Sequence, residues 1–99
     1  MAAHPGIVFR SSPAGRRPGL AGGPDVWEVV RVAREMEESG PDALQRAAEL
    51  AGVAPAQMET ALRYYADYRA EIDAWIDRVD AEAAEAEAAW QRAQDLLGR

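Results

Sequence analysis

Residues 41–69 read PDALQRAAELAGVAPAQMETALRYYADYR, and this stretch decides how the chain is arranged. Each of its two halves places apolar residues at helical spacing. Gly52 suits the left-handed conformation that ends a helix, and Pro55 suits the first turn of the next. The residues expected to face a core are Leu44, Ala47, Ala48, Leu50, Ala51, Met58, Ala61, Leu62 and Tyr65. The pattern predicts a helix-turn-helix, either of the DNA-binding kind or as an ordinary helical hairpin.

The composition excludes several kinds of site. The chain has no cysteine, which rules out disulfides, thiolate zinc sites and cysteine nucleophiles. His4 is the single histidine, and no second strong ligand or base stands near it in the sequence. We therefore expect no enzymatic activity, no cofactor and no metal. With neither a membrane-length apolar run nor a signal-peptide core, a cytoplasmic protein is expected. The abundant alanine, and cations that are all arginine, are typical of GC-rich bacterial genomes.

The charges are unevenly distributed along the chain. The net charge of −6 argues against a general nucleic-acid binder. Residues 1–24 carry three arginines and no acid, whereas residues 70–99 carry eight acids against three arginines. A basic head before an acidic tail fits a protein with two different partners, although solvated helix faces have similar compositions.

Residues 1–24 are rich in Gly, Pro, Arg and Ser, and are expected to form a basic hairpin or a disordered arm. The hairpin would pair a strand at 6–10 with a second at 16–20, and Pro18 would confine the second to an edge. A lone hairpin is marginal in water, so it would need to pack on the helices or pair with another chain.

A first helix is expected over residues 25–38, after the breaker Gly22-Gly23-Pro24. Asp25 at its start favours the helix dipole. Its apolar stripe consists of Val26, Val29, Val30, Ala33 and Met36. Trp27 lies off this stripe, as an extension of the core or as an interface anchor. This helix and the two that follow make up a predicted domain of residues 25–69.

Three tyrosines lie close together near the end of the third helix. Tyr65 falls on its core stripe, while Tyr64 and Tyr68 are expected to be half-buried with their hydroxyls outward. Stacking on a nucleic-acid base is the less favoured alternative. The helix either continues into the tail or bends near residues 67–70, and Asp67 as a potential cap favours the bend.

The C-terminal segment, residues 70–99, has the most regular apolar pattern in the chain. Steps of four and three match the a/d seam of a coiled coil, and the seam residues are Ile72, Ile76, Val79, Ala83, Ala86, Trp90, Ala93 and Leu97. Its first part is apolar enough to join the core, whereas its second part lies too far from the body. The seam is therefore expected to dock a partner or a second copy of the chain.

Two short motifs carry a resemblance to a known family. They are Pro24-Asp25-Val26-Trp27-Glu28-Val29 and Met58-Glu59-Thr60-Ala61-Leu62-Arg63-Tyr64-Tyr65. Together with the head and the helix-turn-helix, over about residues 4–76, they resemble the bacterial family catalogued as domain of unknown function four hundred and thirty-three. Its members look like VapB-type antitoxins. The family's Gly-Thr-Arg before the first helix is replaced here by Ala21-Gly22-Gly23, so Arg16 and Arg17 are the substitutes for its arginine.

The resemblance implies a dimeric, winged-helix-like helix-turn-helix domain with two partners. One is operator DNA, bound for autoregulation, and the other is a PIN-like ribonuclease toxin held by the C-terminal helix. PIN-type nucleases use acidic residues and a divalent metal. An antitoxin tail blocks such a site, often with an arginine that reaches the carboxylates. The candidates for that arginine are Arg78, Arg92 and Arg99.

Two sets of candidate site residues follow. In the helix-turn-helix interpretation, residues 55–63 begin the recognition helix, with base readers and phosphate contacts at Gln57, Thr60, Arg63, Arg16, Arg17 and Arg46. The partner-binding candidates are Ile72, Trp75, Ile76, Arg78, Val79, Trp90, Arg92 and Leu97. The alternative function is a small dimeric transcription regulator whose C-terminal helix only dimerises.

Overall fold

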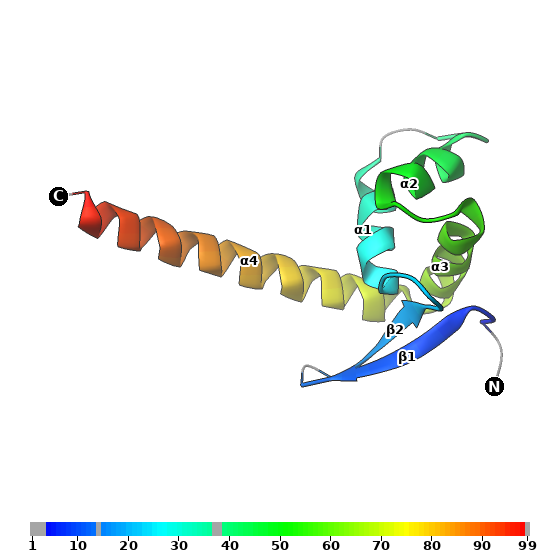
Figure 1. The fold of residues 1–99 in the computed structure, drawn as a ribbon, viewed down its shortest axis with the longest axis horizontal. Helices are drawn as coiled ribbons and strands as arrows, with labels where there is room; N and C mark the ends of the chain where they lie inside the picture. The colour runs from blue at the N-terminus through cyan, green and yellow to red at the C-terminus, as the bar shows by residue number, and fades with distance from the viewer. Residues whose placement is uncertain (1–3, 14, 37–38, 99) are drawn as a thin grey trace.

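The protein folds as a small helical body with a hairpin on one side and a long helix projecting from it (Figure 1). A computed structural model describes residues 4–13, 15–36 and 39–98. The elements in chain order are β1 (Ile7–Ser12), β2 (Gly15–Leu20), α1 (Val26–Glu35), α2 (Ala43–Ala51), α3 (Pro55–Asp67) and α4 (Arg69–Leu97). The predicted mostly helical fold, with an N-terminal hairpin and a long C-terminal helix, is confirmed.

The basic head is a hairpin rather than a disordered arm. β1 pairs antiparallel with β2, in a register that runs from Ile7 opposite Leu20 to Ser12 opposite Gly15. Both strands are edges of a two-stranded sheet, as Pro18 in β2 requires. Leu20 at the base of the hairpin is fully buried among the helices. The hairpin is thus held by packing on the helical body, as a lone hairpin needs.

One buried carboxylate joins the hairpin to α1. Arg10 Nη1 donates to Asp25 Oδ1 at 2.7 Å, and Arg17 Nε donates to the other oxygen of the same carboxylate. Arg10 Nη2 also donates to the carbonyls of Leu20 and Gly23, each at 2.8 Å. The backbone N–H of Asp25 donates to Glu28 Oε2 at 2.9 Å, which closes the start of α1. Two of the three arginines of the basic head therefore share one internal carboxylate, which offsets one of their two positive charges.

The core lies where α1, α2 and α3 meet. The predicted α1 stripe is confirmed, with Val26, Val29 and Val30 buried and Ala33 and Met36 packed partly against them. Trp27 also packs partly against the core. The helix ends at Glu35, three residues before the predicted end, because Met36 adopts an extended conformation. Residues 37–38 lie outside the described residues.

The turn between α2 and α3 forms as predicted. Gly52 ends α2 with a φ of 75°, in the left-handed region, and Pro55 opens α3. Ala47 and Ala48 are buried, with Leu44 and Ala51 partly so. The placement of Leu50 in the core is wrong, since this side chain is exposed. At 100° per residue it lies about 110° from the centre of that stripe.

The prediction for the tyrosines is wrong in one respect. Tyr64, expected to be half-buried, is only 4% exposed, while Tyr65 is partly buried and donates from its hydroxyl to Asp73 Oδ1 at 2.7 Å. The flank of α3 that carries Tyr64 is covered from outside the helix, by the rings of His4 and Phe9. The sequence periodicity of α3 cannot predict that residues from another segment cover this flank.

α3 and α4 are separate helices, so the predicted bend is confirmed. Tyr68 breaks the helical path with φ −128° and ψ 43°, and α4 leaves in a different direction (Figure 1). The cap is Tyr68 and not Asp67. The Asp67 carboxylate instead pairs with Nε2 of His4 at 2.9 Å, which ties the N-terminal segment to the end of α3.

α4 has two parts with different surroundings. In its root, residues 69–80, Ile72 and Ile76 are buried in the core, and Asp73 and Asp80 pair with two arginines of α1. In its tail, residues 81–98, every side chain is exposed. The root belongs to the same core as α1 to α3, and the tail extends into solvent (Figure 1).

Candidate functional site

The tail of α4 presents an apolar stripe that nothing in the described chain covers. Trp90 is 55% exposed and Leu97 is 78% exposed, and Leu96 beside them is also exposed. Small alanines separate these large side chains along the seam. Four acids and one arginine occupy the remaining faces of the tail. The tail is thus an amphipathic helix with an exposed apolar stripe and an acidic outer surface.

The structure divides the predicted partner-binding residues between the two parts of α4. Ile72 and Ile76 belong to the core, as expected for the first part of the seam, so their inclusion among the partner-binding residues is wrong. Val79 and Trp75 are partly buried. The remaining candidates are exposed, and they are Arg78, Trp90, Arg92 and Leu97. The guanidinium of Arg78 lies over the ring of Trp75 at 4.2 Å.

Two of the side chains predicted to contact DNA bases face the end of the hairpin that packs on the helices. Gln57 Oε1 accepts the backbone N–H of Ala54 at 2.9 Å and so caps α3. Thr60 Oγ1 donates to the carbonyl of Ala56 at 3.0 Å. Gln57 and Thr60 line a shallow hollow against Gly6, Leu20 and Ala21, where Gly6 approaches the Thr60 methyl closely. These two side chains are engaged within the protein rather than presented outward.

The predicted arginine contacts lie in different surroundings. Arg63 is exposed on α3 and pairs with Glu59 one turn earlier. Arg46 is exposed on α2, beside a shallow acidic hollow that contains Asp42 and Glu49. Arg17 is held by Asp25, whereas the guanidinium of Arg16 lies 4.2 Å above the ring of Phe9. Arg16 thus lies on the hairpin, whereas Arg63 lies on α3.

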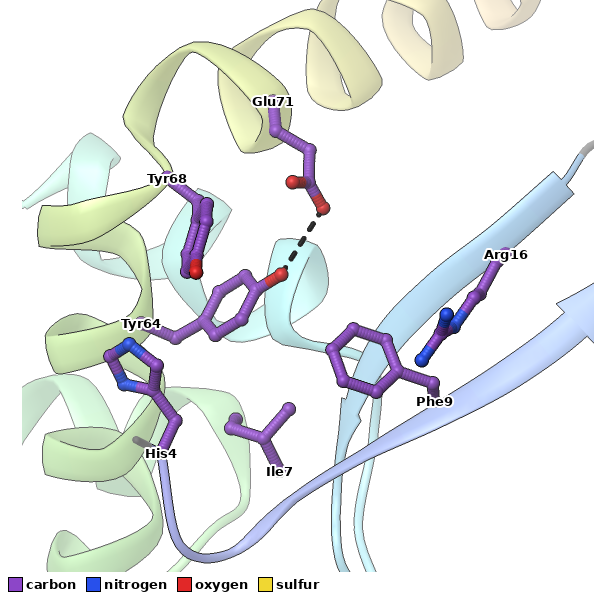
Figure 2. Close-up of a pocket in the computed structure, with 7 residues that line it drawn as sticks. All are labelled: His4, Ile7, Phe9, Arg16, Tyr64, Tyr68 and Glu71. Carbon is purple, nitrogen blue, oxygen red and sulfur yellow. Dashed lines mark hydrogen bonds between the residues drawn. The ribbon is translucent and has the colours of Figure 1, made fainter. Parts of the chain in front are cut away.

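A hollow between the hairpin, α3 and α4 was not predicted from the sequence. Its volume is about 470 Å³. Figure 2 shows its lining, which consists of His4, Ile7, Phe9, Arg16, Tyr64, Tyr68 and Glu71. The rings of Tyr64 and Tyr68 stack with centroids 4.6 Å apart, and His4 meets both edge-on. Because these residues come from four separate segments, only the pairing of Tyr64 with Tyr68 at a spacing of four could have signalled it.

Tyr64 is the polar group at the centre of this hollow. Its hydroxyl donates to Glu71 Oε1 at 3.3 Å. Burial, and then the nearby carboxylate of Glu71, raise the pKa of Tyr64 to about 12. The phenol therefore stays protonated at neutral pH and remains a donor to Glu71.

No group of three or more histidine, aspartate or glutamate side chains in the described part of the chain is placed to hold a metal ion. None of the helices in the described ranges combines the length and the apolar character that crossing a membrane requires.

Comparison of the chain with models of known protein families, with curated proteins and with solved structures finds no match.

Proposed function

We propose that the protein is the antitoxin of a type II toxin–antitoxin module. In this proposal the tail of α4 binds a PIN-like ribonuclease toxin and blocks its active site, and the helical body binds operator DNA as a dimer. It acts in the cytoplasm as an interaction protein, with neither enzymatic activity nor a cofactor. The observation that carries the proposal is the exposed seam of the tail, with Trp90 and Leu97 as its large side chains.

The physical argument begins with the stability of the tail. A helix without tertiary contacts is marginal in water, and the many alanines of the tail raise its helix propensity. Alanines contribute little apolar area but allow a partner surface to approach closely. Exposed anchors on such a helix fit recognition by a groove, in which a few large side chains supply most of the binding energy. The acidic outer face favours a basic partner surface.

The DNA-binding part of the proposal rests on α2, the turn at residues 52–54 and α3, with the hairpin in the place of a wing. Since Gln57 and Thr60 face the hairpin, base reading falls mainly to Arg63 on the exposed side of α3. Arg46 and Arg16 supply phosphate contacts. The nearby acids Glu59 and Asp42 weaken the binding of DNA by a single copy of the chain, so a dimer is required.

The alternative, a dimeric regulator without a toxin, uses the same exposed seam. In that case two tails pair with each other, and Trp90 and Leu97 are buried against a second copy. Heptad spacing supports both functions, because self-association and partner docking need the same stripe.

Deleting residues 82–99 separates the two functions. We expect the truncated protein to stay folded, because the described part of this segment has no buried side chain. Affinity for the product of the neighbouring gene, measured by calorimetry, should fall below detection while ultracentrifugation still shows the dimer. Loss of the dimer with no partner found favours the regulator. If neither property changes, the seam is not a docking surface.

The DNA-binding part has its own test in a gel-shift titration with the operator region. Arg63→Ala is expected to weaken operator binding by roughly tenfold and to relax its sequence preference. Arg16→Gln should weaken binding to all sequences alike. It should also lower the slope of log affinity against log salt concentration by about the amount that one phosphate contact contributes. Arg17 is unsuited to this test because its removal also disturbs the hairpin. Unchanged binding by the Arg63 variant would exclude α3 as the reader.

A further inference from the structure

We propose that the hollow between the hairpin, α3 and α4 is a binding site for a guanine nucleotide, free or within an unpaired strand. This site is separate from the tail of α4 and from the exposed face of α3, and it shares only Arg16 with the proposed DNA-binding surface. Its lining combines stacked rings with a carboxylate on one side and a guanidinium on the other (Figure 2). A nucleotide has the matching parts, namely a flat base, donors along the base edge and a phosphate.

The rings provide the surface for a base. Tyr64 and Tyr68 are stacked with an interplanar angle of 30°, and Phe9 meets Tyr64 edge-on with centroids 6.4 Å apart. Phe9 is 49% exposed and Tyr68 is 44% exposed, so the hairpin and the end of α3 both present ring surface to solvent. The volume of about 470 Å³ is enough for a base and its sugar. Aromatic side chains in such an arrangement are typical stacking platforms for bases.

Glu71 selects the base. Its Oε1 accepts only the long hydrogen bond of 3.3 Å from Tyr64, and in the described part of the chain Oε2 has no hydrogen-bond donor. A carboxylate with free lone pairs can accept two neighbouring donors. Guanine alone among the common bases has two adjacent donors, N1–H and N2–H₂, on its Watson–Crick edge. Adenine and cytosine place an acceptor beside their amino group, which would face the carboxylate unfavourably.

Arg16 provides the charge for the phosphate. Within the described residues it makes no ion pair with a carboxylate, unlike Arg10 and Arg17, which share Asp25. Its guanidinium is held by its contact with the face of Phe9 at 4.2 Å. Figure 2 shows Arg16 on the hairpin beyond Phe9, whereas Glu71 projects from α4 above Tyr64. The anionic and cationic groups are thus separated by the rings, as the two ends of a nucleotide are.

The test uses the full chain and titrates GMP, AMP, CMP, UMP and guanosine by calorimetry and by NMR shifts of the aromatic side chains. We expect saturable one-to-one binding of GMP, about tenfold tighter than that of AMP, the size of discrimination typical of a paired base edge. Guanosine should bind more weakly than GMP, and raising the salt concentration should weaken the binding of GMP but not that of guanosine. Single-stranded oligonucleotides with one guanine distinguish the sources, since tighter binding than GMP assigns the site to a strand.

Three variants assign the contacts. Glu71→Gln should remove the preference for GMP over AMP, and Arg16→Gln should make GMP bind no better than guanosine. Phe9→Leu keeps the apolar volume but removes the ring, and should weaken every nucleotide by roughly tenfold. Glu87→Gln, an exposed substitution in the tail of α4, is the matched control for Glu71→Gln and should change nothing. Circular dichroism confirms that each variant is folded.

Several results would overturn the proposal. They are no binding of GMP at about 1 mM, equal binding of GMP and AMP, or a preference that Glu71→Gln leaves intact. Tighter binding of choline or free arginine than of GMP would also overturn it, because the rings and Glu71 would then form a cation site. None of these results depends on a toxin or an operator, so the outcome is independent of the proposed antitoxin function.

Discussion

Replacing Asp25 by asparagine is expected to lower the free energy of unfolding by about 3 kcal/mol, the low end of the range for breaking a buried ion pair. The carboxylate is shared by Arg10 and Arg17, and its side chain is only 9% exposed. Asparagine keeps the size of the side chain and can still accept one hydrogen bond, but it leaves two guanidinium groups without a counter-charge. The hairpin and the start of α1 should therefore separate first.

Urea denaturation followed by tryptophan fluorescence and circular dichroism measures this loss. The matched control is Asp80→Asn, because Asp80 also pairs with an arginine, Arg31, but its side chain is 50% exposed. An exposed pair of this kind contributes at most about 1 kcal/mol. Equal effects of the two substitutions would show that the shared carboxylate at Asp25 is no more important than a surface ion pair.

Truncating the seam of α4 at its two ends is expected to separate stability from partner binding. Ile76→Ala should cost about 3 kcal/mol of stability, because this side chain is 2% exposed and its removal leaves a cavity. Leu97→Ala, at the exposed end of the same seam, should change stability by no more than about 0.5 kcal/mol. If the tail binds a partner, Leu97→Ala should instead cost about 2 kcal/mol of binding free energy, roughly a thirtyfold loss of affinity.

Thermal unfolding and calorimetric titration of the neighbouring gene product measure the two effects in the same variants. Trp90→Ala is the second variant for the tail, since Trp90 is the other large exposed side chain on the seam. A stability loss from Leu97→Ala as large as that from Ile76→Ala would mean that the tail folds back in solution. Unchanged partner affinity in both tail variants would remove the seam from the binding surface.

The local signals in the sequence predicted the elements well. Gly52 and Pro55 act through backbone conformation alone, so the end of α2 and the start of α3 could be placed from residue type. The helical spacing of Val26, Val29 and Val30 likewise defines the buried face of α1. The break between α3 and α4 was also predicted, although from Asp67, which in the structure pairs with His4 instead of capping the helix.

Contacts between distant segments could not be predicted in this way. The apolar pattern predicted one seam over the last thirty residues, with a first part that joins the core and a second part that does not. The tertiary structure decides where the boundary falls, between a buried root that contains Ile76 and an exposed tail that contains Leu97. Tyr64 is buried because the N-terminal segment covers it, and Arg10 and Arg17 share one carboxylate because the hairpin brings both to Asp25. Propensity and periodicity act within a few residues along the chain. Burial, ion pairing and the lining of the aromatic hollow depend on which segments meet, and the packing of the whole chain decides that.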